Sequence, residues 1–152
     1  VQIALRKEYH YIFAKKTYPG SPKINLESID YETFEIDPEI ELTPIEVMHY
    51  KLPVLGFRIG DLTYITDAKT IADKEKEKIK GSKTLIVNAL RKEPHMSHFN
   101  LEEALEFIKE ISPEKAYLTH ISHLFDTHNN IEAQLPEGVF AAYDGLKIPF
   151  NC

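Results

Sequence analysis

The sequence contains a single cysteine, Cys152 at its last position, and no apolar run that approaches the roughly 18 residues of a membrane-spanning helix. One cysteine excludes an intrachain disulfide framework and suits the reducing cytosol. No signal-peptide pattern is visible either. We therefore expect a cytoplasmic protein that has no membrane partner.

A basic patch is also missing. The 18 lysines and arginines are outnumbered by 24 aspartates and glutamates, which gives a formal net charge of −6. The one dense group of lysines, residues 74–83, alternates with acids in the manner of a solvated helix face. An acidic chain without a basic stripe is a poor general binder of nucleic acid, which argues against such a partner.

Motifs of three common enzyme classes are absent as well. The sequence has no GxSxG nucleophile elbow, no GxGxxG dinucleotide fingerprint and no GxxxxGK[ST] phosphate loop. Ser97 lies between two histidines but lacks the glycines of a strained strand-to-helix turn. These absences argue against a Ser-His-Asp hydrolase and against a phosphate-cradling nucleotide fold.

The patterns that are present predict an α/β fold of the α+β type, a mixed sheet with helices packed on it. With 152 residues, of which 43% are hydrophobic, we expect one domain over residues 1–152. The expected elements are a helix over Val1–Phe13, strands at Pro44–His49, Val54–Ile59 and Leu62–Thr66, a helix over Ala68–Lys80, a buried strand at Thr84–Leu90, a helix capped by Asn100 and Glu103, a strand at Lys115–Thr119 and a closing hairpin over Val139–Phe150.

Metal-binding side chains lie at the ends of these elements. His49 ends a predicted strand, Asp67 and His120 each follow one, and His95 and His98 precede a predicted helix. Imidazoles and a carboxylate suit Zn²⁺, with Mn²⁺ and Fe as alternatives, and the lack of a thiolate favours an open hydrolytic site. A carboxylate among histidines can bridge two metal ions with a hydroxide between them. Taken singly, His49 could be a sheet-edge histidine and Asp67 a helix cap.

Four segments, MHYKLPVLGFRIG, YITDAKTI, HMSHFNLEEAL and YLTHISH, resemble the metallo-β-lactamase-fold hydrolases. Within that family they look most like the phosphodiesterase branch that contains the phosphoribosyl cyclic phosphodiesterase. The tRNA 3′-end-processing endonuclease is a more distant member. The resemblance extends from Val1 to Phe150 and implies half of an αββα sandwich.

The resemblance also implies roles for individual residues. His49 and His120 match metal-binding histidines, and Asp67 matches the aspartate that bridges two divalent ions, Zn or Mn. His98 matches the histidine that contacts phosphate and acts as a general acid. His95 and His123 are expected either at the substrate side or as residues that support these groups, and plain surface roles stay open as the alternative. The implied reaction is hydrolysis of a small cyclic or nucleotide-like phosphodiester.

The family's HxHxDH motif, which supplies its first metal ligands, is absent from this sequence. We therefore expect the chain to be the C-terminal portion of a longer hydrolase, whose N-terminal half is disordered, cleaved or deleted. Such a portion is expected to associate with a second copy or with the missing half. Two alternatives stay open: a hydrolase of the same fold acting on thioesters, lactones or RNA 3′ ends, and an inactive, self-associating half-domain.

Overall fold

The structure, a computed structural model, describes residues 1–151, and Cys152 lies outside the described residues. The chain divides into two compact units, Val1–Asp30 and Tyr31–Cys152, and the expectation of a single domain stays a prediction. In chain order the elements are α1 (Gln2–Glu8), α2 (His10–Phe13), β1 (Phe34–Asp37), β2 (Ile40–His49), β3 (Leu52–Ile59), β4 (Leu62–Ile65), β5 (Thr70–Ile71), α3 (Asp73–Ile79), β6 (Thr84–Asn88), α4 (Leu101–Ile111), β7 (Lys115–Thr119), α5 (His128–Glu132) and β8 (Val139–Ala141).

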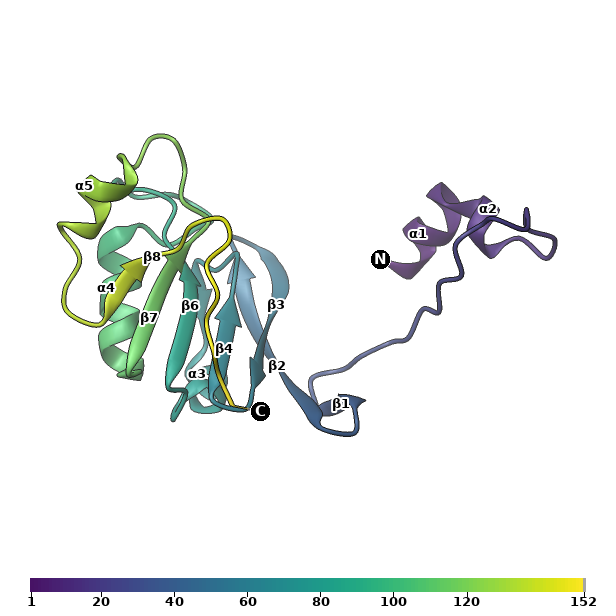
Figure 1. Ribbon diagram of the computed structural model, residues 1–152, viewed down its shortest axis with the longest axis horizontal. Helices are drawn as coiled ribbons and strands as arrows, with labels where there is room; N and C mark the ends of the chain where they lie inside the picture. Colours follow the sequence, from purple (N-terminus) through teal and green to yellow (C-terminus); the bar gives the residue numbers. More distant parts are fainter. Residues whose placement is uncertain (152) are drawn as a thin grey trace. The chain divides into compact units, whose positions relative to one another are not determined.

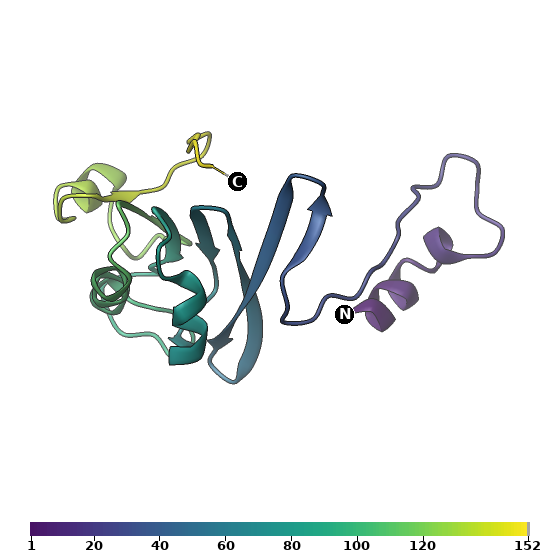
Figure 2. The same ribbon diagram turned by 90° about the horizontal axis from the view of Figure 1, so that it is seen from below.

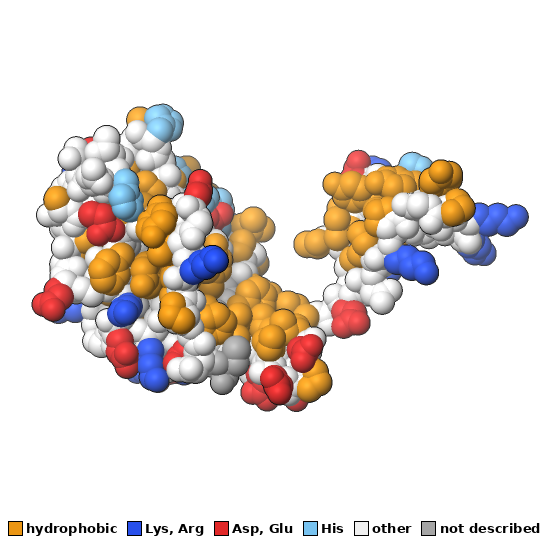
Figure 3. All heavy atoms as spheres, viewed as in Figure 1, with side chains coloured by type: hydrophobic (Ala, Val, Ile, Leu, Met, Phe, Trp, Pro, Cys, Tyr) orange, Lys and Arg blue, Asp and Glu red, His pale blue; other side chains and the backbone are white. Residues whose placement is uncertain are grey.

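The first unit holds α1 and α2, which replace the single helix predicted over Val1–Phe13. The helix is interrupted at Tyr9, whose backbone leaves the helical region with φ −106° and ψ 40°. Neither helix has a buried residue, and Ile3 is 86% exposed. Figure 3 shows apolar side chains on the surface of this unit. No helix among residues 1–151 is long and apolar enough to cross a membrane.

The second unit is built on an eight-stranded mixed sheet with the order β1-β2-β3-β4-β6-β7-β8, and β5 pairs with β2 (Figure 1). The strands from β1 to β4 are antiparallel hairpin neighbours, whereas β4, β6, β7 and β8 are parallel. This mixed α/β sheet confirms the predicted fold class. Because β2 and β4 are both antiparallel to β3, the strands β2, β4, β6 and β7 end at the same edge of the sheet.

The core lies between the sheet and the helices α3 and α4, which cover one face of it (Figure 2). Along β6 the side chains of Leu85 and Val87 are fully buried in this core, while Ile86 alternates to the other face. That other face is open enough to leave Tyr64 and Phe140 more than a third exposed, and apolar side chains are visible on it in Figure 3. Association through such a surface with a second copy stays a prediction.

The helix predicted over Ala68–Lys80 was placed too early. α3 begins only at Asp73, because Thr70 and Ile71 instead form β5 against Val47 and Met48 of β2. The β-branched side chains of this pair favour a strand, and backbone pairing with β2 satisfies their polar groups. Asp67 therefore does not cap a helix, and the N-cap position belongs to Ala72.

The predicted closing hairpin is also wrong. β8 forms, but it pairs in parallel with β7, and residues 146–150 are not a strand. This last segment crosses the open face of the sheet (Figure 1), and Asn151 exchanges hydrogen bonds with Asp61 in the β3–β4 turn. Pro149 lacks the N–H that a second hairpin strand would need in its ladder.

Candidate metal centre

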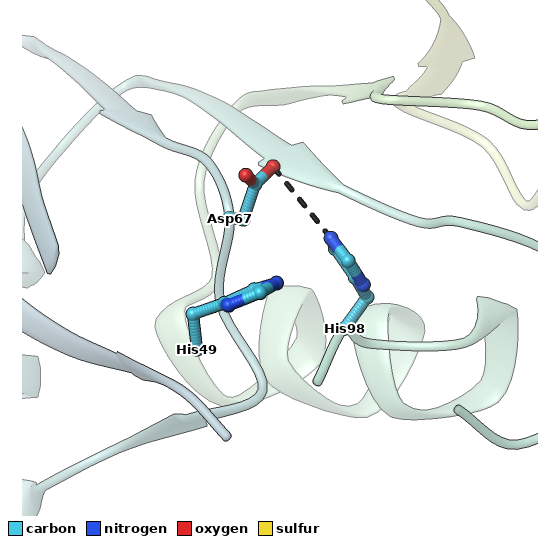
Figure 4. A group of neighbouring side chains, drawn as sticks. All are labelled: His49, Asp67 and His98. Atoms are coloured by element: carbon cyan, nitrogen blue, oxygen red, sulfur yellow. Dashed lines mark ion pairs between the residues drawn. The ribbon is translucent and has the colours of Figure 1, made fainter. Parts of the chain in front are cut away.

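The predicted metal-binding side chains meet at the edge of the sheet where the parallel strands end. His49 is the last residue of β2, Asp67 lies just after β4, and His120 directly follows β7. His98 comes from the loop that leads into α4, and Figure 4 shows it pointing toward Asp67 beside His49. Chain segments far apart in sequence therefore contribute to one cluster, because their strands run in the same direction.

The distances within the cluster are those of a site that could hold a cation. One ligand atom each from His49, Asp67 and His98 lie within 4.8 Å of one another. Oδ1 of Asp67 is 3.2 Å from Nδ1 of His120 and 3.9 Å from Nε2 of His98. Asp67 is thus the common neighbour of these histidines, and its side chain remains 37% exposed, so it is open to solvent and small ligands.

His98 lies at the centre of the cluster. Its ring centroid is 4.7 Å from that of His49, 4.9 Å from that of His95 and 4.8 Å from that of His120, on which it stacks. Burial lowers the pKa of His98 below its usual value, and the positive charges of the neighbouring imidazoles, His120 first, lower it further, whereas Asp67 raises it. The net effect favours the neutral imidazole in this arrangement.

The second ring nitrogen of His98, Nδ1, contacts two neighbouring residues. Nδ1 of His98 is 3.0 Å from Nδ1 of His95 and 3.0 Å from Oγ of Ser97. With Nδ1 engaged in this way, Nε2 is the nitrogen that faces Asp67. The structure thus brings His95 into the cluster. His123 is exposed in the loop after β7, and within the described part of the chain no contact joins it to the cluster.

Backbone hydrogen bonds fix the loops that carry the site relative to one another. Each of the following bonds joins a residue next to a site residue to another strand or loop: Lys69 N–H to Met48 O at 2.8 Å, Phe99 N–H to Ala68 O at 2.8 Å, and Ala89 N–H to Thr119 O at 3.0 Å. Loops held by a rigid sheet are a common location for catalytic groups. The cluster is therefore pre-organised by main-chain contacts and does not depend on side-chain packing alone.

Asn88 is a supporting residue that the sequence reasoning missed. It ends β6, is fully buried, accepts a hydrogen bond from Ala68 N–H at 2.6 Å and donates one to Ala68 O at 3.0 Å. Since Ala68 follows Asp67, Asn88 sets the position of the backbone beside the carboxylate. The signal was present in the sequence: Asn88 is an amide residue that follows the apolar residues 85–87, at the end of a strand.

The start of α4 is tied to the same region. The predicted capping box is confirmed, because Asn100 Oδ1 accepts from Glu103 N–H and Glu103 accepts from Asn100 N–H. The ammonium of Lys69, two residues after Asp67, lies 2.6 and 2.8 Å from the carboxylate oxygens of Glu103. One carboxylate thus caps the helix and anchors the loop that carries Asp67.

Two residues at the edge of the site have a left-handed backbone. Tyr50, directly after His49, has φ 57°, and His120 has φ 56°. Positive φ is uncommon for residues other than glycine, and such conformations concentrate at functional sites. Here they turn the chain sharply at the end of β2 and of β7, where the cluster lies.

The residues present fit a divalent metal ion. Imidazole nitrogens and one carboxylate are the donor set of open zinc and manganese sites, and the group found among residues 1–151 consists of these donors. The geometric group consists of His49, Asp67 and His98, whereas the predicted ligands were His49, Asp67 and His120. The roles of His98 and His120 toward a metal stay predictions.

Known proteins resemble this chain both in sequence and in structure. The crystal structure of a new diphosphatase from the PhnP family superposes with a TM-score of 0.86 at 29% identity, over 99% of this chain and 55% of that protein. The metallo-β-lactamase-fold protein YhfI from Bacillus subtilis superposes with a TM-score of 0.69 at 19% identity, over 92% of this chain and 59% of that protein.

A curated relative, an octanoyltransferase of Porphyromonas gingivalis, is 34% identical over 146 residues, which are 95% of this chain and 30% of that protein. This chain therefore spans just over half of the solved relatives and less than a third of the curated one. Residues 1–121 match the Beta-lactamase superfamily domain. With that match, and with the same fold in the solved relatives, the chain belongs to the beta-lactamase superfamily and has the metallo-β-lactamase fold.

Proposed function

We propose that this protein is a metal-dependent hydrolase of a small cyclic or nucleotide-like phosphodiester. The proposal is based on the position of His98, which lies on the loop before α4 and not at the end of a strand. One ring nitrogen of His98 faces Asp67, while His95 and Ser97 contact the other ring nitrogen. The 29% identity to a diphosphatase of the PhnP family supports phosphorus as the reacting centre.

His49, Asp67 and His120 would hold the metal, since they offer the nitrogen and oxygen donors that a divalent ion of this kind takes. A bound divalent ion supplies Lewis-acid polarisation of the phosphoryl oxygens and lowers the pKa of water at the site. The chain's own contribution is to hold the substrate phosphorus over this edge of the sheet, where the half-exposed Asp67 and His120 are accessible.

His98 would then donate its Nε2 proton to the leaving alkoxide as water attacks phosphorus and the phosphorus–oxygen ester bond breaks. The free cluster favours neutral His98, but an approaching phosphodiester anion, like Asp67, favours the protonated form. The substrate thereby helps to charge its own general acid. Protonated His98 also stabilises the negative charge that develops on the phosphoryl oxygens.

The test is turnover of adenosine 2′,3′-cyclic phosphate and of bis(4-nitrophenyl) phosphate by the protein at its full natural length, loaded with Zn²⁺ or Mn²⁺. His98→Ala should lower kcat by about 100- to 10,000-fold, the usual range for loss of general acid catalysis, while metal content by elemental analysis is unchanged. His128→Ala, a histidine exposed on α5, is the matched control. Full activity of His98→Ala would contradict its assignment.

A second candidate is hydrolysis of an acyl thioester, which is favoured by the relative named an octanoyltransferase. The same metal-binding residues would serve either reaction, so the sequence of the site does not separate them. The discriminating measurement is kcat/KM for an octanoyl thioester beside that for the phosphodiesters. A thioester value that is higher by a factor of ten or more would replace the first proposal with the second.

A further inference from the structure

An apolar hollow adjoins the metal centre. It is lined by residues that follow His49 on the β2–β3 turn and by residues of the loop before α4: His49, Tyr50, Lys51, Leu52, Met96 and Ser97. His49 belongs to the site itself, and Ser97 contacts His98. The hollow is therefore close enough to the cluster for one ligand to occupy both.

The apolar side chains of the hollow, Tyr50, Leu52 and Met96, are named the shelf. They are 51%, 60% and 64% exposed, respectively. Single exposed apolar residues are ordinary, but three large ones that gather in one hollow beside a polar site mark a binding surface. The other residues that line the hollow are Lys51 and two groups of the site, His49 and Ser97.

The form and charge of the hollow favour a flat aromatic group over a flexible chain. The shelf is half open to solvent, so a rigid ring can bury one whole face on it, whereas an acyl chain would lose rotamer freedom for partial burial. The ammonium of Lys51 lies 5.3 Å from the centroid of the Tyr50 ring and places a positive charge beside the shelf. That charge complements a phosphate ester and offers nothing to a neutral thioester.

We propose that the shelf binds the nucleobase of a nucleotide-like phosphodiester whose phosphate lies at the cluster, an inference that rests on the proposed function. Tyr50, which lines the hollow directly after the end of β2, stacks on the base. The thioether of Met96 and the side chain of Leu52 cover the remaining edge of the base. Tyr50 is thus a specificity-determining residue for the base-bearing half of the substrate.

The test compares two substrates with the same reacting group, adenosine 2′,3′-cyclic phosphate and the base-free methyl ribofuranoside 2,3-cyclic phosphate. Base stacking predicts a kcat/KM about 5- to 150-fold higher for the adenosine compound. Tyr50→Ala should bring this ratio close to one, and Tyr50→Phe should preserve it. Tyr143→Ala, which removes a tyrosine that is exposed to a similar degree outside the hollow, should leave the ratio unchanged.

A binding measurement separates this inference from the proposed reaction. In protein with ¹³C-labelled methionine methyl groups, adenosine 5′-monophosphate should shift the Met96 signal upfield through the ring current, and ribose 5-phosphate should not. Met48, half-buried in β2, is the internal reference, and Met96→Leu assigns the signals. Turnover of both cyclic phosphates with equal kcat/KM and an unmoved Met96 signal would overturn the shelf but leave the function. Turnover of neither would overturn the function and, with it, the inference.

Discussion

Replacing Asn88 with alanine removes the side chain that holds the backbone beside Asp67. Asn88 is fully buried and makes two hydrogen bonds to Ala68, one to its N–H and one to its carbonyl. The Ala68 carbonyl keeps a second partner, Phe99 N–H at 2.8 Å. The Ala68 N–H is left without its acceptor, in a place where the surrounding residues shield it from water.

The expected loss of stability follows from these contacts. A buried donor without a partner costs about 1–3 kcal/mol, and the lost packing of the amide adds about 1 kcal/mol, so the free energy of unfolding should fall by about 2–4 kcal/mol. The backbone next to Asp67 also gains freedom. Loss of a residue that supports a metal ligand weakens metal binding by about 10- to 100-fold.

The assays are urea unfolding of the metal-free protein and zinc affinity by competition with a chelating dye. Thr63→Val is the matched control, because Thr63 lies in the neighbouring strand β4 and is as fully buried as Asn88. Its hydroxyl bonds at 2.6 Å to Ser82, which lies just after α3 and away from the cluster. It should cost about 1 kcal/mol and leave zinc affinity unchanged. Wild-type zinc affinity in Asn88→Ala would refute the positioning role, and wild-type stability would refute the hydrogen-bond reasoning.

Three further predictions concern other parts of the sheet and the cluster. Gly56→Ala should destabilise the protein by about 1–3 kcal/mol in urea unfolding, although alanine usually improves a strand, because the added Cβ would lie 2.9 Å from the Tyr64 carbonyl oxygen. Burial raises the pKa of Glu75, but the ammonium of Lys78 at 2.9 Å and the backbone N–H of Glu46 lower it by more, so the net shift of this pKa is downward. A carboxylate with a lowered pKa stabilises the fold above about pH 4.5, and this stability is lost as the pH falls through the folded-state pKa. Unfolding between about pH 5 and about pH 3 should therefore be less pH-dependent in Glu75→Gln. Zn²⁺ at about 100 times its Kd should stabilise the wild type by about 2.7 kcal/mol, measured as a rise in Tm, and Asp67→Asn by much less.

Each of these predictions has a clear contrary result. If Gly56→Ala instead raises stability, the neighbouring strand shifts enough to accommodate the added methyl group. An unchanged pH dependence in Glu75→Gln would place the acid sensitivity on other carboxylates. Equal zinc-induced shifts in the wild type and in Asp67→Asn would remove Asp67 from the ligand set.

The sequence predicted best those features that nearby residues decide. The strand Lys115–Thr119 has the expected bounds, because a short apolar run between Pro113 and His120 leaves few choices. The helix start at Asn100 follows from a capping box, a contact between residues three apart. By contrast, the start of α3 depended on β5 pairing with Val47 and Met48 of β2, a contact between distant segments that no local pattern records.

Taken alone, the sequence determined that His49 ends a strand, that Asp67 and His120 follow strands and that His98 stands before a helix, since strand periodicity and caps are local signals. Only the tertiary structure decided that β2, β4 and β7 run in one direction, which brings those residues to the same edge. It also decided that Asn88, the last residue of β6, bonds to the backbone beside Asp67, and that Tyr50, Leu52 and Met96 share one hollow. Strand order and direction arise from the burial of the whole sheet against α3 and α4, a free energy summed over distant residues that no short stretch of sequence contains.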